Sequence, residues 1–337
     1  MILVIRYDKL HVQYTRYCTK EGLRPMENYK NKLMSKNGRV TMLLARELLA
    51  HNEGDRIKTI GEYAGYFDTG RGTVQSALRF LQDSGAISLE SKGHLGTYIL
   101  MLNYKNLWEI SDLGVIMGVM PLPYSKRYEG LATGLYKAFE KANIPFSLAF
   151  MRGSKMRMQA LTLGKYSFAI VSKLAANLEM ETNPNIEIVH EFSEGSYVKN
   201  HVIIFKDKNK VEIEDKMRIA LDTSSIDQAI LTSWECKGKD VQYVETSYSQ
   251  IIQKLMNNEI DAAIWNADEI DENNLELNIQ PLKNLDALKA DRDDTIAAIL
   301  TSKDNENLGD TIKKFIEMDF IEYVQKKVIS KEIIPTY

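Results

Sequence analysis

The stretch DTGRGTVQSALRFLQDSGAISLESKGHLGTY, residues 68–98, decides the fold of the first third of this chain. In its first half, apolar residues recur at spacings of three and four positions, as on one face of an α-helix. That face consists of Val74, Ala77, Leu78 and Leu81. Gly85 follows at the position where a helix commonly ends in a left-handed residue. Residues 86–89 and 97–102 are β-prone runs around a glycine-containing tip, so the stretch predicts a helix followed by a β-hairpin.

The opposite face of the predicted helix is polar and carries two guanidinium groups. Hydroxyl, amide and guanidinium groups on one helix face can hydrogen-bond to base edges and phosphates in a DNA major groove. The tip of the hairpin adds a lysine and a histidine. We therefore predict a recognition helix and a wing that contact double-stranded DNA; the alternative is an ordinary amphipathic helix followed by a hairpin. The predicted DNA-binding residues are Arg71, Thr73, Gln75, Ser76, Arg79, Lys92 and His94.

This segment resembles the winged helix-turn-helix of the GntR-type regulators. The resemblance rests on RGTV at 71–74, on Ala77 and Leu78, on the helix exit at 81–85, and on the wing sequence GHLGTY at 93–98. It implies the order helix, helix, turn, recognition helix and wing, in which the recognition helix lies in the major groove.

The residues upstream fit that order. Residues 39–51 have the apolar spacing of an amphipathic helix, and Thr59 with Glu62 forms a capping box that opens a second, short helix. Two positions depart from the GntR pattern: Gly70 replaces a capping serine, and Gly61 replaces a basic residue that touches the DNA backbone. Both departures imply fewer phosphate contacts, hence weaker affinity and a shallower salt dependence.

Length and composition are those of an ordinary soluble protein. The 337 residues suffice for two or three compact units, with 26% charged and 44% hydrophobic residues. Cys18 and Cys236 lack the spacing of a metal site, and we interpret them as free thiols in a reducing compartment. No apolar run is long enough to span a membrane, and the start lacks a signal-peptide cleavage site. We therefore expect a cytoplasmic protein.

Charge is distributed unevenly along the chain. Residues 1–110 carry 16 Lys+Arg and 11 Asp+Glu, whereas the remainder carries 27 and 35. A basic end joined to an acidic body fits a protein that faces nucleic acid at one end. Residues 1–38 carry 8 basic and 3 acidic residues, which accounts for the whole positive charge of the first 110 residues. The predicted winged-helix segment therefore has no excess positive charge of its own. The prediction that it binds DNA depends on where its polar side chains lie on the recognition helix and the wing.

The sequence divides into three parts. Residues 1–33 are an extension that either precedes the true start of the protein, which we favour weakly, or forms an arm that contacts DNA or a partner subunit. Residues 34–104 are the predicted winged helix-turn-helix domain, after which a polar join at 103–112 leads onward. Residues 105–337 alternate strands and helices, the pattern of a two-lobed α/β domain, closed by one helix at 308–328.

The second half resembles the type II periplasmic-binding-protein fold, which many bacterial regulators use as an effector domain. The resemblance lies in ALTLGKYSFAIVS at 160–172 and IIQKLMNNEIDAAIWN at 251–266. Both halves together resemble the YhfZ family of regulators, through the sequences at 120–135, 150–161, 172–176 and 261–266. This resemblance implies a winged helix joined to a two-lobed domain that binds an effector.

Ligands of open α/β sheets bind beyond the carboxyl ends of the strands, where helix N-termini also point. Hydroxyls at helix starts and one arginine favour a small anionic metabolite, and the aromatic rings favour stacking on it. The alternatives are that the serines are only helix caps, that the arginine is a structural ion-pair partner, and that the tryptophan is core. The predicted effector-binding residues are Pro123, Tyr124, Tyr128, Arg152, Gly153, Ser154, Ser172, Ser224, Ser225, Trp265 and Asn266, with Ser247 and Tyr248 as further strand-end candidates.

The main rival is an enzyme on the same fold, and a third interpretation is an α/β domain that only dimerises. The chain has no nucleophile elbow, P-loop, zinc-protease or dinucleotide-binding motif, and its five histidines are scattered without metal-ligand spacing. We therefore expect no catalytic residues, metal or cofactor. The predicted function is a homodimeric, cytoplasmic transcription regulator in which a small-molecule effector changes the affinity for operator DNA.

Overall fold

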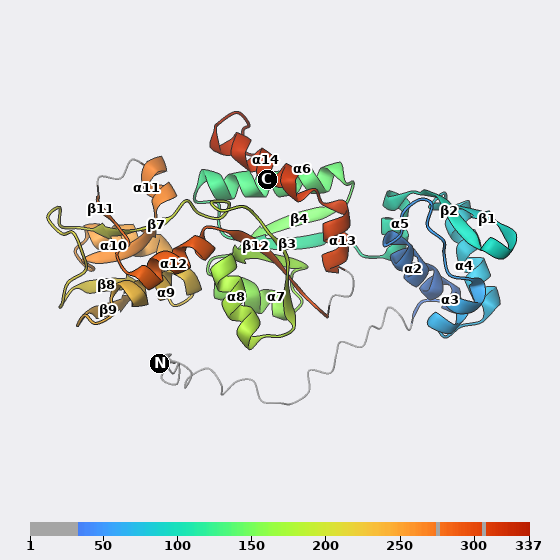
Figure 1. Ribbon diagram of the computed structural model, residues 1–337, viewed down its shortest axis with the longest axis horizontal. Helices are drawn as coiled ribbons and strands as arrows, with labels where there is room; N and C mark the ends of the chain where they lie inside the picture. Colours follow the sequence, from blue (N-terminus) through green and yellow to red (C-terminus); the bar gives the residue numbers. More distant parts are fainter. Residues whose placement is uncertain (1–32, 274–276, 305–307) are drawn as a thin grey trace.

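The computed structural model describes residues 33–273, 277–304 and 308–337 of the chain. The predicted extension at 1–33, apart from its last residue, and Cys18 lie outside these ranges. Three regions follow one another along the longest axis: a small N-terminal region at one end, a first α/β lobe in the middle, and a second α/β lobe at the other end (Figure 1). Among the described residues, no helix has the length and apolar character needed to cross a bilayer.

The N-terminal region has the predicted winged helix-turn-helix order. Thr59 and Glu62 form the predicted capping box, with Thr59 Oγ1 accepting from the Glu62 N–H at 3.2 Å and Glu62 Oε2 accepting from the Thr59 N–H at 2.7 Å. Gly85, at φ +67°, follows the recognition helix as predicted. The elements are α2 Lys36–Leu49, α3 Ile60–Tyr66, α4 Arg71–Asp83, β1 Ile87–Ser91, the 3₁₀ turn η2 Gly93–Leu95, and β2 Thr97–Leu102.

The polar join expected at 103–112 is a helix, α5 Tyr104–Ser111. The Asn103 side chain caps it by accepting from the Asn106 N–H at 3.1 Å. Leu107 and Trp108 are buried where α5 packs against α2. Two buried apolar side chains are too few to show a helical period in the sequence. The helix was therefore not predicted.

The first lobe is built on a five-stranded sheet in the order β4-β3-β5-β12-β6. Neighbours β4, β3 and β5 are parallel, whereas β12 runs antiparallel to both of its neighbours. Helices α6, α7 and α8 connect or cover these strands (Figure 1). The elements are β3 Ile116–Met120, α6 Lys126–Lys141, β4 Phe146–Phe150, α7 Ser154–Thr162, β5 Phe168–Ser172, α8 Lys173–Thr182, β6 Ile186–Glu191 and β12 Ala297–Ser302.

The second lobe repeats this plan in the order β11-β7-β10-β8-β9. Its strand β10 is buried along its whole length between two apolar clusters. Three of its elements, α11, β11 and α12, were absent from the sequence prediction. The elements are β7 His201–Phe205, β8 Arg218–Leu221, α9 Ile226–Glu235, β9 Gln242–Glu245, η3 Tyr248–Gln250, α10 Ile251–Met256, β10 Ala262–Asn266, α11 Ala267–Asn273, β11 Asn278–Pro281 and α12 Leu285–Asp294.

The chain passes between the lobes twice, at residues 192–200 and again at 295–296. After the second passage, β12 returns to the first lobe. The single closing helix expected at 308–328 is instead two helices, α13 Leu308–Phe315 and α14 Met318–Ile329. Helix α14 packs closely along α6, where a Cβ on Gly134 would lie 2.7 Å from the Ile321 carbonyl oxygen.

Helix α13 joins the first lobe to the winged-helix region (Figure 1). The Lys314 ammonium donates to the carbonyls of Leu49, at 2.8 Å, and of His51. The Phe315 ring lies edge-on to Tyr104 of α5, with ring centroids 4.8 Å apart. Polar and aromatic contacts therefore tie α13 to both α2 and α5.

Candidate DNA interface and effector cleft

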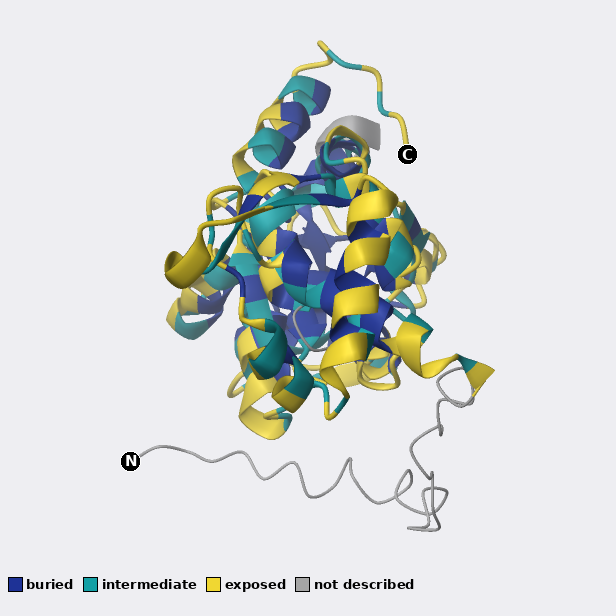
Figure 2. Ribbon diagram, turned by 90° about the vertical axis from the view of Figure 1, so that its right-hand side faces the viewer, coloured by how far each residue is buried: buried dark blue, intermediate teal, exposed yellow. Residues whose placement is uncertain are grey.

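Helix α4 presents the predicted polar face to solvent. Its apolar residues Val74, Ala77, Leu78 and Leu81 are buried, whereas Arg71, Gln75, Ser76 and Arg79 are exposed and Thr73 is partly exposed. Figure 2, which looks toward the winged-helix end, shows the exposed outer faces of the helices there in yellow. The fold thus leaves all five predicted side chains of α4 accessible to a DNA groove.

The two departures from the GntR pattern have visible structural consequences. Gly70 caps α4 without a side-chain hydrogen bond, as expected for glycine. A Cβ on Gly61 would lie 3.5 Å from a terminal nitrogen of Arg71, so the Arg71 side chain extends back over α3. The guanidinium group therefore lies beside the position where a GntR-type domain would carry its basic residue.

The wing is held by a third arginine that the sequence analysis did not single out. Arg56 forms a β-bridge with Tyr98 and packs its guanidinium against Gly96, where a Cβ would lie 2.5 Å from Nε. Gly96 has φ +103°, a conformation that L side chains rarely adopt. At the tip, His94 is exposed, while Lys92 pairs with Glu90 at 3.2 Å and lies 4.9 Å from the Tyr98 ring centroid. Part of the Lys92 charge is therefore compensated within the wing.

A cleft lies where the two α/β lobes meet, with about 610 Å³ of unfilled space when the open mouth is included. Both lobes and the first interlobe passage contribute to its walls. Of the predicted effector residues, Tyr124, Tyr128, Arg152, Gly153, Ser154, Ser225 and Asn266 line it, together with the further candidate Tyr248.

Four predicted effector residues, Pro123, Ser172, Ser224 and Trp265, do not line the cleft. Ser172 is buried and donates to Asp227 Oδ1 at 2.6 Å. Ser224 binds Asp222 through its backbone N–H and its hydroxyl, at 2.9 and 2.5 Å. Trp265 is 3% exposed and stacks on Tyr248 with ring centroids 4.0 Å apart, so it supports the wall from behind.

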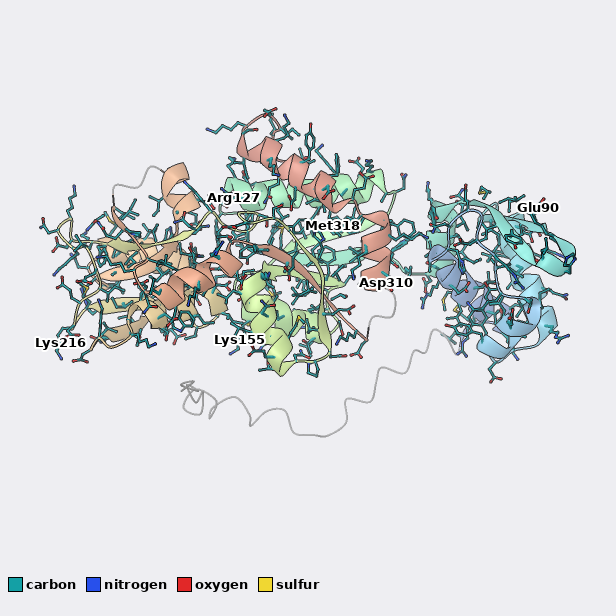
Figure 3. All side chains as sticks on the ribbon, in the orientation of Figure 1. Glu90, Arg127, Lys155, Lys216, Asp310 and Met318 are labelled. Carbon is teal, nitrogen blue, oxygen red and sulfur yellow. The ribbon has the colours of Figure 1, made fainter. Side chains whose placement is uncertain are left out.

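Two predicted effector residues, Ser154 and Ser172, make hydrogen bonds between the lobes. Ser154 Oγ, from the first lobe, accepts from the N–H of Ile226 at the start of α9 in the second lobe, at 3.2 Å. The Ser172–Asp227 hydrogen bond also crosses between the lobes. At the rim, Arg127 Nε donates to Asp268 Oδ1 at 2.9 Å; Figure 3 labels Arg127 at the boundary of the lobes. The structure therefore has the lobes in a closed arrangement.

Most of the charged residues that line the cleft were not predicted from the sequence. One reason is that several of these residues lie on the interlobe segments or on the unpredicted helices α11 and α12, away from the carboxyl ends of the strands. The lining residues that were not predicted are Pro121, Leu122, Arg157, Tyr197, Val198, His201, Asp222, Asp227, Gln228, Glu269 and Asp294.

Arg157 is a buried cation in the wall of the cleft. It is 3% exposed, and it donates from Nε to the Ile170 carbonyl at 3.0 Å and from Nη1 to the Met151 carbonyl at 2.8 Å. Its Nη2 donates to the hydroxyl of Tyr197 at 2.9 Å. Burial raises the pKa of Tyr197 above its ordinary value, so this hydroxyl stays neutral. Arg157 thus holds the Tyr197 hydroxyl and two backbone carbonyls in place beside the cleft, and all three groups that accept its hydrogen bonds are neutral.

His201 and two aspartates form a buried charged group beside the cleft. The Nδ1 atom of His201 lies 2.8 Å from Asp291 Oδ1 and 3.1 Å from Asp294 Oδ2. Burial by itself lowers the pKa of His201, but Asp294 and Asp291 outweigh it and raise this pKa to about 9. Burial, followed by the charge of Asp227, raises the pKa of Asp294 well above its ordinary value.

The same three residues bear on the prediction, made from the spacing of the histidines, that the protein has no metal site. The histidines lack ligand spacing in the sequence, yet the fold brings donor atoms of His201, Asp291 and Asp294 within 4.8 Å of one another. Asp291 also accepts from the backbone N–H of His201, at 3.2 Å. In the structure these donor atoms form ion pairs between the His201 ring and the two carboxyl groups.

We expect His201 to make the stability of the protein depend on pH. Its pKa in the folded state, about 9, exceeds the ordinary value of 6.5. Its stabilising contribution is therefore complete below pH 6.5 and is lost as the pH rises through about 9. His201→Gln should remove about 1–3 kcal/mol of this pH-dependent unfolding free energy. Urea denaturation at pH 6, 7, 8 and 9 measures it, with the exposed His94→Gln as the control. Identical profiles for wild type and His201→Gln would contradict the assignment.

The architecture defines a class of protein: a helix-turn-helix domain followed by a two-lobed domain like the periplasmic binding proteins. Comparison with known proteins supports both parts. Residues 103–337 match the family described as the YhfZ C-terminal domain, and residues 52–99 match a family described as a helix-turn-helix domain. The chain belongs to the YhfZ family.

Individual relatives agree. The uncharacterized protein YhfZ of Escherichia coli (strain K12) is 34% identical over 309 residues, which is 90% of this chain and 98% of that protein. The crystal structure of YhfZ from Shigella flexneri has a TM-score of 0.57 at 33% identity and covers 69% of this chain and 97% of its own. The periplasmic aliphatic sulphonate binding protein SsuA from Escherichia coli has a TM-score of 0.50 at 12% identity, covering 65% of this chain and 75% of its own, which shows a shared fold alone.

Proposed function

We propose that this protein is a DNA-binding transcription regulator whose affinity for operator DNA changes when a small metabolite is held between its two lobes. The observation that carries the proposal is the joining, in one chain, of an exposed polar recognition helix to a cleft-bearing domain. We further propose that it acts in the cytoplasm as a homodimer. A twofold-symmetric pair of winged helices would meet half-sites separated by about 34 Å, one helical turn, or a multiple of it.

The contacts suggest how the cleft communicates with the DNA-binding end. Asp294, which lines the cleft, ends α12 and immediately precedes the second interlobe passage. The chain then forms β12 and reaches α13, where Lys314 and Phe315 contact the winged-helix region. If ligand binding shifts the second interlobe passage, β12 and α13 would shift with it. The contacts of α13 with α2 and α5 would then change the position of the winged-helix region.

The mouth of the cleft suits an anionic group. Arg152 is exposed, and among the described residues no carboxylate lies within ion-pair distance of its guanidinium. It directly precedes the N-terminus of α7, whose positive dipole end also favours negative charge. These features support a carboxylate, phosphate or sulphonate on the effector.

The proposal is tested with the full-length protein and duplex DNA selected by that protein from a random pool. A thermal-shift screen of carboxylates, phosphorylated sugars, sulphonates and amino acids identifies a ligand, and fluorescence anisotropy then measures operator affinity with and without it. A ligand that stabilises the protein and changes operator affinity supports the proposal. Failure to select any duplex, or an operator affinity that the ligand leaves unchanged, contradicts it.

Arg152→Ala should weaken the ligand found in this screen by about tenfold, because a charge-assisted hydrogen bond is lost. Operator affinity without ligand should stay the same, since Arg152 lies in the effector domain. Isothermal titration and anisotropy measure the two affinities, and Lys155→Ala, an exposed cation three residues further on, is the control. An Arg152→Ala variant that loses operator affinity but keeps ligand affinity would refute the assignment.

One observation favours the enzyme alternative. The buried carboxyl groups of Asp227 and Asp294 have raised pKa values, caused first by burial, and such groups are common among catalytic acids and bases. Mass spectrometry of the ligand after prolonged incubation with the protein distinguishes the two functions. A regulator returns the ligand unchanged, whereas an enzyme converts it.

A further inference from the structure

The deep end of the cleft is acidic, which an anion-binding site alone does not explain. Asp222, Asp227, Glu269 and Asp294 all line the cleft, and each is less than a tenth exposed. Three of them have clear structural partners, and for Glu269 this partner is the side chain of Tyr248. Asp222 accepts from the backbone and hydroxyl of Ser224 and from the N–H of Tyr248, and Asp227 accepts from Ser172. These two carboxylates hold the loops and lobes together.

Asp294 is different. It is fully buried, and neither of its carboxylate oxygens accepts a hydrogen bond from a described residue. His201 Nδ1 is 3.1 Å from Oδ2, but the hydrogen bond of this nitrogen is made with Asp291, at 2.8 Å. A buried carboxyl group without a hydrogen-bond donor is costly even when it pairs with a charge such as that of His201, because its hydrogen bonds to water are not replaced. Asp294 thus lines the cleft with a carboxyl group whose acceptor capacity is unused.

Tyrosine rings surround the same end of the cleft. Tyr128 and Tyr197 meet edge to face with centroids 5.2 Å apart, and Tyr124 lies 6.5 Å from Tyr248. All four rings line the cleft. Aromatic faces combined with carboxylates are the surroundings that a protonated amine prefers, since both attract positive charge.

We propose that the effector is a zwitterion of the amino-acid class, whose primary ammonium group donates to Asp294 among the tyrosine rings while its acidic group binds Arg152. The inference rests on the proposed regulator function and specifies the ligand of the same cleft. An effector with only anionic groups would leave Asp294 without a donor and would bring further negative charge toward it. An ammonium group supplies three donors and one positive charge at that place.

The charges around Asp294 make the binding depend on pH. Its neighbours are Asp227 on α9, Asp291 on α12, His201 on β7, Arg157 on α7, and the hydroxyl of Ser172 at the end of β5. Burial and the charge of Asp227 raise the pKa of Asp294 well above its ordinary value, so this carboxyl group ionises less readily than an exposed aspartate. Because an ammonium group pairs with the ionised form of Asp294, binding should strengthen as the pH rises.

The test uses the full-length protein and isothermal titration with each of the twenty standard amino acids, their D-enantiomers, and matched N-acetyl and deaminated analogues. We expect one or more amino acids to bind and their N-acetyl and deaminated analogues to bind at least about tenfold more weakly. Asp294→Asn should weaken the amino acid by about tenfold or more. The control Asp293→Asn makes the same change at the neighbouring residue, which is half-exposed and 3.8 Å from Lys173, and should leave the affinity unchanged.

Each contrary outcome overturns the inference. These outcomes are that deaminated acids bind as tightly as amino acids, that Asp294→Asn has no effect on a ligand that binds, and that no amino acid binds. Binding of Zn²⁺ or Mn²⁺ in place of amino acids, lost in His201→Gln and Asp294→Asn, would instead assign the cluster to a metal. If a deaminated acid binds and changes operator affinity, the proposed regulator function stands while the zwitterion is rejected.

Discussion

Replacing both Arg71 and Arg79 by alanine is expected to lower the affinity of the full-length protein for its selected operator by at least about a hundredfold. Both side chains are exposed on α4, and removal of an arginine that contacts a base or a phosphate costs about 1–3 kcal/mol. The loss of two cationic contacts should also reduce the slope of log affinity against log salt concentration by about 2. Fluorescence anisotropy at several salt concentrations measures both quantities.

The control for this experiment removes a comparable charge elsewhere. Arg292 is exposed on α12 in the second lobe, and Arg292→Ala should leave operator affinity and salt slope unchanged. Figure 3 shows how far the lobes extend from the wing, with Lys216 and Glu90 at opposite ends of the molecule. Ligand binding should survive in the double variant. If the double variant bound the operator as tightly as Arg292→Ala does, α4 would not be the recognition helix.

The winged-helix region could be predicted because its signals are local. The period of the α4 stripe, the capping box at Thr59 and the exit at Gly85 each depend on residues within one turn of each other. The strand and helix alternation of the two lobes is likewise local, since each buried strand is a short apolar run. These features fixed the order of elements, while the sheet topology followed from the family resemblance.

The missed elements lack such local signals. Helix α12 carries Leu285 and Leu288 on its outside, at 74% and 41% exposed, so its hydrophobic residues do not mark its buried face. Its buried face includes Asp291 and Asp294, which a search for apolar periodicity would place in solvent. Helix α12 was therefore not predicted from the sequence. Asp294, which the proposed ammonium group of the effector would contact, was missed for the same reason.

The cleft shows a similar division. The rule that ligands bind beyond strand ends identified Tyr124, Arg152 and Asn266 as cleft residues, because each lies at the end of a strand or within four residues after it. It could not find Tyr197 and His201, which the first interlobe passage brings to the cleft. The same rule could not distinguish a serine that contacts a ligand from one that hydrogen-bonds the opposite lobe. The difference depends on how closely the two lobes approach each other, which the sequence does not show.

The lobes approach each other closely at Gly153, and Gly153→Ala is expected to abolish the response to ligand while the protein stays folded. Gly153 has φ +78°, and a Cβ there would lie 2.7 Å from the carbonyl oxygen of Ser224 in the other lobe. The contact involves backbone, so it is relieved most readily by separation of the lobes. Separation would break the hydrogen bonds from Ile226 to Ser154 and from Ser172 to Asp227. Small-angle scattering should show a larger radius of gyration, and the titration should show no ligand-induced change in operator affinity.

Gly164→Ala separates this steric effect from backbone strain. Gly164 ends the same helix with φ +67°, but no atom lies within 4 Å of its Cβ position. Both variants bear the strain of a left-handed residue, about 1–2 kcal/mol. Only Gly153→Ala also meets the opposite lobe, so Gly164→Ala should melt at a lower temperature yet keep its closed dimensions and its ligand response. If the two variants respond to ligand equally well, closure of the lobes at Gly153 does not control the DNA-binding end, because removing that contact would then have no consequence beyond local strain.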